Sequence, residues 1–139
     1  MTAEFPVAVH ALVYLAVHPG REFNSNELAD NICTNPARVR KVMAKLCHHR
    51  LAVSFKGQGS GYRCIDSARE TVLSQVLKAL DEQAFSACWK TGDKERDCLV
   101  CSGMSTVMES VYTKLNQNAI SLLEGITIGS LCDKITSRA

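Results

Sequence analysis

The stretch NSNELADNICTNPARVRKVMAKLCHHRLAVSFKGQGSGY, residues 24–62, decides the fold of this 139-residue chain. Between Asp30 and Asp66 the chain has no acidic residue but seven basic ones, which leaves nine basic residues against 14 acidic ones elsewhere. The formal charge of +2 therefore hides a positive pole on a molecule that is otherwise acidic. A pole of this kind suits the binding of a polyanion. Its basic residues are Arg38, Arg40, Lys41, Lys45, Arg50, Lys56 and Arg63.

Two helices are predicted inside this stretch. Asn24 followed by Glu27 has the spacing of a reciprocal N-terminal cap, so a first short helix begins there. After a tight turn, Asn35 can cap a second helix, which Pro36 opens because the first helical position needs no backbone donor. That helix runs to about His49, and its basic side chains lie opposite an apolar stripe. The stripe consists of Val39, Val42, Met43 and Leu46. This is the helix-turn-helix pattern, whose second helix enters the major groove of DNA.

A β-hairpin is predicted directly after the second helix. Residues 51–55 and 62–65 alternate like strands, and the segment KGQGSG, residues 56–61, forms a glycine-rich turn between them. In a winged helix, such a tip lies along the phosphate backbone or enters the minor groove. The glycines alone are explained by a tight hairpin. Their combination with two capped helices and the absence of acidic residues predicts nucleic-acid binding.

Helical patterns flank the stretch on both sides. From about Glu4 to His18 the spacing predicts a first helix, packed under the helix-turn-helix. Thr71 to Glu82 predicts a further helix after the hairpin. The apolar stripe of this further helix is Val72, Leu73, Val76, Leu77 and Leu80. Residues 1–82 are therefore interpreted as a winged helix-turn-helix DNA-binding domain, mainly α with a small β-hairpin.

Composition points to the cytoplasm. The hydrophobic share of 46% is ordinary for a globular protein, and no apolar run approaches the roughly 20 residues of a membrane span. Glu4 and His10 interrupt the opening segment, so no secretory signal is predicted. Seven cysteines are an odd number and are interpreted as thiols, metal ligands or redox groups rather than a disulfide framework.

A cysteine-bearing loop and a long helix complete the chain. Residues 83–102 lose the helical period and are interpreted as a sensor loop containing Cys88, Cys98 and Cys101. Residues 103–139 are interpreted as a dimerisation helix and a C-terminal segment, with the helix ending before Gly125. The stripe of the long helix is Met104, Val107, Met108, Val111, Leu115, Ala119, Leu122 and Leu123. So regular a stripe is expected to pair with its copy in a two-fold dimer, although packing across its own domain is an alternative.

This order of elements resembles the Rrf-two family of bacterial transcriptional regulators, which includes IscR, NsrR and CymR. The most specific segments are residues 56–62 of the wing, residues 79–82, and the closing ITIGSL at residues 126–131. The resemblance implies a homodimer that binds a partly palindromic operator, mostly as a repressor. It also implies base contacts by Arg38, Arg40 and Lys41 and a wing contact by Lys56. The full set of expected DNA contacts is Asn35, Arg38, Arg40, Lys41, Lys45, Lys56, Gly57, Gly59 and Tyr62.

The cysteine loop departs from the family pattern. Iron-sulfur members resemble one another in carrying three loop cysteines and a fourth ligand of another type around a 2Fe-2S cluster. Cys98 matches the last of these cysteines and Cys88 the first, whereas the middle one is missing and Cys101 falls at the histidine ligand of IscR-like members. Three interpretations stay open: a 2Fe-2S cluster, a redox switch between two thiols, or a loop that is inert or binds zinc. A fourth ligand would come from elsewhere, such as Glu4 or a partner chain.

Two other classes of function compete with this interpretation. An enzyme with a cysteine nucleophile would need a base beside it, but His48 and His49, next to Cys47, end the predicted recognition helix, so no enzyme is expected. The closer alternative is a winged-helix module that binds another protein without a cofactor, or a regulator controlled by a protein partner. Such a module has no need to exclude acidic residues from both the recognition helix and the wing.

Overall fold

The helix-turn-helix forms where the sequence predicts it. In the computed structural model, which describes residues 1–139, α2 covers Ser25–Ile32 and α3 covers Pro36–His48. The Asn24 side chain accepts a hydrogen bond from the backbone N of Glu27 at 2.8 Å, and the Glu27 carboxylate accepts one from the backbone N of Asn24 at 2.7 Å. Asn35 caps α3 in the same way, accepting from a backbone N–H at 2.8 Å. These caps fix where each helix begins, and so set the direction of the chain between them.

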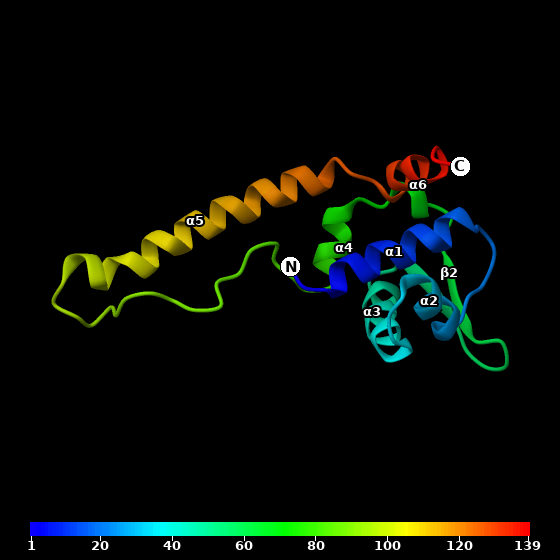
Figure 1. Ribbon diagram of the computed structural model, residues 1–139, viewed down its shortest axis with the longest axis horizontal. Helices are drawn as coiled ribbons and strands as arrows, with labels where there is room; N and C mark the ends of the chain where they lie inside the picture. Colours follow the sequence, from blue (N-terminus) through cyan, green and yellow to red (C-terminus); the bar gives the residue numbers. More distant parts are fainter.

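The hydrophobic core lies between α3 and α1 (Glu4–Val17), which crosses the body above the helix-turn-helix (Figure 1). All four side chains of the predicted α3 stripe are fully buried there. Burying a side chain such as Leu46 contributes about 1.5–3 kcal/mol relative to exposure. The core therefore holds α3 in place with its basic face turned outward.

The wing is anchored to the body at its root. Strands β1 (Ala52–Phe55) and β2 (Gly61–Cys64) pair antiparallel. Phe23 extends this pairing, since its backbone N and O lie 2.9 and 2.7 Å from the O and N of Tyr62. A Cβ at Gly61 would lie 2.8 Å from the Phe23 carbonyl oxygen, so only glycine fits there. Figure 1 shows the tip of the hairpin projecting from the same side of the body as α3.

The helix after the hairpin is shorter than predicted. A 3-10 turn, η1 (Ala68–Glu70), precedes α4, which covers Leu73–Ala79 rather than the whole of residues 71–82. Val72 is extended and forms an isolated bridge with Thr127. Apolar periodicity could not reveal this boundary, because the pairing partner of Val72 lies 55 residues further along the chain.

The chain returns to the body at its C-terminal end. Helix α6 (Ile128–Thr136) packs on α1 and η1, and the side chain of Cys132 is fully buried. The glycine of the ITIGSL segment, Gly129, lies where α6 comes close to η1. A Cβ at this position would lie 2.8 Å from the backbone oxygen of Arg69, so glycine allows α6 to approach η1.

Gly129→Ala is expected to lower the free energy of unfolding by about 1–3 kcal/mol, because the added Cβ must displace the backbone at Arg69. Gly103→Ala is the matched control. A Cβ on Gly103 meets nothing, and exchanging glycine for alanine inside a helix should stabilise the protein by about 0.5–1 kcal/mol. Chemical denaturation measures both effects. A Gly129→Ala protein as stable as the wild type would show that this contact does not hold α6.

Helix α5 (Leu99–Glu124) forms an arm that projects from the body (Figure 1). At 1.5 Å per residue, its 26 residues span about 39 Å. It begins before the predicted boundary at residue 103, so Cys101 lies in the helix rather than in the loop. The segment between α4 and α5 runs along this arm. The Asn116 side chain bonds the backbone N and O of Phe85 at 2.8 and 2.9 Å, and Lys90 pairs with Glu109 at 2.6 Å.

Candidate nucleic-acid interface

The outermost face of α3 carries short and basic side chains. Ala37, Lys41, Ala44 and His48 lie opposite the buried stripe, and all four are exposed. The two alanines leave room for a close approach to base edges, and a methyl group can contact the methyl of thymine. Sequence reasoning did not single out either alanine. The sequence does indicate them, because the two alanines lie two helical turns apart and opposite the apolar stripe.

Arg38 and Arg40 flank this outer face, one on each side, and both are exposed. The Arg40 guanidinium donates a hydrogen bond to Ser25 Oγ on α2 at 3.3 Å. Ser25 was not predicted as part of the site. By tethering Arg40, it links the first helix of the helix-turn-helix to an arginine predicted to read bases.

Glu4, the first residue of α1, pairs with two of the predicted DNA contacts. Its carboxylate oxygens lie 2.7 Å from Lys41 Nζ and 2.8 Å from Lys45 Nζ. Hydrogen bonds from Lys41 and then Lys45 lower the pKa of Glu4 below its ordinary value. The Lys41 side chain stays 66% exposed, whereas that of Lys45 is 34% exposed. Lys41 is therefore the more accessible of the two lysines. The Glu4 carboxylate, which was considered as a metal ligand, is instead paired with two ammonium groups.

Glu4→Gln is expected to make DNA binding more salt-dependent. The substitution releases Lys41 and Lys45, and each lysine that then reaches a phosphate steepens the slope of log affinity against log salt by about one. Fluorescence anisotropy with a duplex of arbitrary sequence measures this slope. Glu22→Gln removes an exposed acid elsewhere on the body and should leave the slope unchanged. If Glu4→Gln leaves the slope unchanged as well, releasing the two lysines adds no contact to phosphate.

The same substitution has a pH signature. Because the pKa of Glu4 in the folded protein lies below the ordinary 4.5, its ion pairs stabilise the fold fully above that pH. This stabilisation is lost as the pH falls through the lowered pKa. Glu4→Gln should therefore lower the free energy of unfolding at neutral pH. It should also make the further loss of stability on acidification smaller than in the wild type. Denaturation at neutral pH and at a pH below the lowered pKa of Glu4 measures both effects.

The wing tip presents Lys56 beside two glycines in left-handed conformations. Gly57 has a φ of 100° and Gly59 a φ of 82°, and the tip is exposed. A hydrogen bond of 3.0 Å from the backbone N of Ser60 to the Gly57 oxygen closes the turn. Tyr62 lies at the root instead, where burial raises the pKa of its hydroxyl. The tip is thus free to follow a phosphate backbone, while Tyr62 packs against the core.

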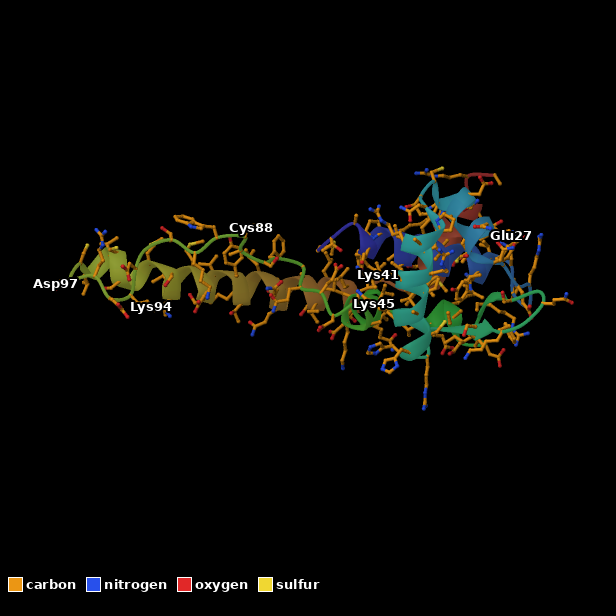
Figure 2. The ribbon with its side chains drawn as sticks, turned by 90° about the horizontal axis from the view of Figure 1, so that it is seen from below. Glu27, Lys41, Lys45, Cys88, Lys94 and Asp97 are labelled. Atoms are coloured by element: carbon orange, nitrogen blue, oxygen red, sulfur yellow. The ribbon has the colours of Figure 1, made fainter.

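The three cysteines of the predicted sensor loop are not brought together. Cys88 is exposed on the segment along α5, Cys98 is exposed just before α5, and Cys101 is partly exposed in its first turn. No group of three or more His, Cys, Asp or Glu side chains in the chain is placed to hold a metal ion. As placed here, these residues do not fit a cluster held by a single chain. Figure 2 shows Cys88, Lys94 and Asp97 along the arm, away from Lys41 and Lys45 on α3.

Backbone contacts fold the loop onto the start of α5. The backbone N of Asp93 donates to the carbonyl oxygen of Cys101 at 3.0 Å. Gly92 has a φ of 77°, and a Cβ on it would clash with that same oxygen. This closes the polar segment between residues 92 and 101. Cys98 and Cys101 are left one helical turn apart at the end of the arm.

Helix α5 has one side that its own chain covers and an apolar face that stays open. Ser105 and Leu123 are buried, and Met108 and Tyr112 are partly covered by the chain itself. The open face extends over most of the helix, with side chains that are 37–72% exposed. Its members are Val100, Met104, Val107, Val111, Leu115 and Leu122. Neither α5 nor any other helix combines the length and apolarity needed to cross a bilayer.

Known proteins share this sequence pattern and this fold. The model of the Rrf2 family, described as an iron-dependent transcriptional regulator, matches residues 1–134. BadM of Rhodopseudomonas palustris, whose name assigns it to the HTH-type transcriptional regulators, is 22% identical over 123 residues. The matched region covers 88% of this chain and 74% of BadM.

Solved structures extend the similarity over nearly the whole chain. A transcriptional regulator from Lactobacillus plantarum has a TM-score of 0.85 at 22% identity, covering 98% of this chain and 91% of that one. IscR of T. potens has a TM-score of 0.70 at 18% identity, with coverages of 97% and 87%. CymR, the global cysteine regulator of B. subtilis, has a TM-score of 0.69 at 11% identity, covering 96% of both chains. At these identities the likeness concerns the fold, and it confirms the mainly helical architecture with its hairpin and long helix. On the family match over residues 1–134, this chain belongs to the Rrf2 family of transcriptional regulators.

Proposed function

We propose that this protein is a homodimeric, sequence-specific DNA-binding regulator that represses transcription by occupying a partly palindromic operator. One observation carries the proposal: α3 and the wing tip project from the same side of the body, and neither contains an acidic side chain (Figure 1). In this arrangement α3 enters the major groove, where Arg38, Arg40 and Lys41 contact bases. Lys56 and the glycines of the wing follow the adjacent phosphate backbone.

The open face of α5 supports the dimer. Six apolar side chains lie uncovered along this helix, which extends beyond the body of its own chain (Figure 1). A two-fold axis through the middle of the helix would pack this face against its copy, because an isologous interface uses the same surface twice. The same axis would present two copies of α3 to two half-sites of a palindrome.

Regulation through the arm is supported by a chain of contacts that leads to α3. Glu82, at the base of the arm, accepts a hydrogen bond from the backbone N of Thr2 at 2.8 Å. The Thr2 hydroxyl in turn accepts one from the backbone N of Glu4 at 3.2 Å. Since Glu4 holds Lys41 and Lys45, a displacement of the arm at Glu82 would reach the recognition helix through two residues.

Thiol chemistry is the form of sensing that the arm supports best. Cys98 and Cys101 lie at its end, where Cys98 is exposed and Cys101 is partly exposed, so an oxidant in solvent can reach both. A 2Fe-2S cluster would require further movement of the loop toward Cys88, or donors from a second chain, because one chain does not bring the three thiols together. Iron and acid-labile sulfide analysis after anaerobic purification distinguishes these two mechanisms.

Cys98→Ser and Cys101→Ser are each expected to abolish the change in DNA affinity that hydrogen peroxide or nitric oxide causes in the wild type. Both variants should fold, since neither thiol is buried. Fluorescence anisotropy before and after each treatment measures the response. Cys33→Ser, at an exposed thiol in the turn of the helix-turn-helix, is the control and should respond as the wild type does. A Cys98→Ser, Cys101→Ser double variant that still responds would place the sensor elsewhere.

A further inference from the structure

The β-hairpin of the wing has an inner face turned toward the body and an outer face turned away from it. Residues directly opposite each other in an antiparallel pair share a face, and the faces alternate along each strand. The inner face consists of Ala52, Ser54, Tyr62 and Cys64, of which Ala52 is buried. The outer face consists of Val53, Phe55, Gly61 and Arg63. Its Val53 is 36% exposed, so this face is open to solvent.

On the outer face, the side chain of Arg63 is held by an aromatic ring. The guanidinium carbon of Arg63 lies 4.6 Å from the centre of the Phe55 ring, where cation–π attraction and planar stacking hold it. Val53 is directly opposite Arg63, and Phe55 lies two residues nearer to the tip. The Arg63 side chain therefore leans along the hairpin toward the tip, and its charge lies nearer to the tip than its backbone does.

The Arg63 guanidinium has no acidic partner within the chain. The ion pairs of the structure are formed by other residues, and Arg63 is partly exposed. Lys41 and Lys45, by contrast, share the carboxylate of Glu4. Residues 31–65 contain no acidic side chain that could compete for this charge. A guanidinium that is stacked but unpaired presents planar donors whose geometry fits a phosphate group.

We propose that Arg63, held in place by Phe55, contacts a phosphate of the DNA backbone on the outer side of the wing, beside the phosphates that the tip follows. This rests on the proposed DNA-binding function and adds a contact that the sequence did not single out. A phosphate carries no base identity, so the contact increases affinity for all sequences alike. Phe55 is a positioning residue in this arrangement, because it reduces the freedom that the Arg63 side chain loses on binding.

A structural role for Arg63 is the competing explanation. The apolar stem of the arginine would then only shield the Phe55 ring from water. Removing Arg63 would lower the stability of the hairpin but would not change the number of phosphates that the protein neutralises. The salt dependence of DNA binding separates the two roles, since its slope reports that number.

Fluorescence anisotropy with a duplex of arbitrary sequence, over a series of salt concentrations, tests the contact. Arg63→Gln is expected to reduce the slope of log affinity against log salt by about one, and Arg63→Lys, which keeps the charge, should retain the slope. Arg63→Gln combined with Lys56→Ala should reduce the slope by about two, because the two side chains contact different phosphates. Arg138→Gln removes an exposed arginine near the end of the chain and should leave the slope unchanged.

The role of Phe55 is tested through Arg63. Phe55→Leu is expected to weaken binding, whereas Phe55→Tyr keeps a ring beneath the guanidinium and should bind as the wild type does. In an Arg63→Gln background, Phe55→Leu should weaken binding no further, because the residue that it positions is already gone. Circular dichroism checks that each variant is folded. If Phe55→Leu weakens binding equally in both backgrounds, Phe55 does not act through Arg63.

The outcomes separate this inference from the proposed function. If the wild type binds the duplex and Arg63→Gln retains the full slope, the phosphate contact is overturned and DNA binding by α3 and the wing tip stands. A wild type that binds no duplex, even at low salt, would overturn both.

Discussion

Val111→Glu combined with Leu115→Glu is expected to convert the dimer to monomers and to lower operator affinity by about 100-fold or more, the usual scale of a lost second contact. Both side chains are partly exposed on the open face of α5, so the substitutions do not disturb the body. In the dimer, each substitution occurs twice beside the two-fold axis. Four carboxylates would then be buried without partners, and leaving even one such charge unpaired costs about 3–5 kcal/mol.

The matched control adds the same charge to the other side of the same helix. Thr106→Glu combined with Gln117→Glu lies on exposed polar positions of α5 and should leave the protein dimeric. Size-exclusion chromatography with light scattering measures the mass, and circular dichroism checks that α5 stays helical. If the Val111 and Leu115 variant remains a dimer, the two copies meet through another surface.

Arg40→Ala is expected to cost about 1–3 kcal/mol of binding free energy at the operator and to relax the choice of base at one position. Arg40 is exposed beside the outer face of α3 and is tethered by Ser25, so removing it takes away a positioned donor.

Lys56→Ala should act differently from Arg40→Ala. A lysine that contacts phosphate weakens binding to all sequences alike and reduces the salt slope by about one.

Arg138→Ala serves as the control for Arg40→Ala, because this exposed arginine lies near the end of the chain and outside the proposed interface. Competition binding with operator variants, each changed at one base pair, separates the two effects. Arg40→Ala with unaltered affinity and base preference would remove Arg40 from the recognition surface. A Lys56→Ala protein that alters base preference would move the wing from the backbone to the bases.

Much of the body could be predicted from the sequence because its signals are local. The caps by Asn24 and Asn35 and the buried stripe of α3 each depend on residues within a few positions of one another, and the structure confirms them. The wing follows from its alternating strands and glycine-rich turn, which are also short-range signals. The mainly helical architecture and the family were predicted for the same reason.

The remainder depends on contacts between distant residues. Val72 looked like the start of a helix, but its pairing with Thr127 holds it extended. For the site, Glu4 was considered as a fourth metal ligand, whereas it pairs with lysines about 40 positions away. The start of α5 at Leu99 was missed because Cys101, Ser102 and Gly103 interrupt the apolar period there. No periodic pattern can report contacts of this range.

Selection of duplexes from a random DNA library by the 139-residue chain, followed by sequencing and footprinting of the enriched site, tests sequence-specific recognition by a two-fold dimer. We expect an enriched motif with two-fold symmetry, whose half-sites are centred about one helical turn, or roughly 34–36 Å, apart and are both protected. Enrichment of no motif, with binding that depends only on salt, would contradict sequence-specific recognition by α3. A single unsymmetric half-site would contradict the proposed dimer.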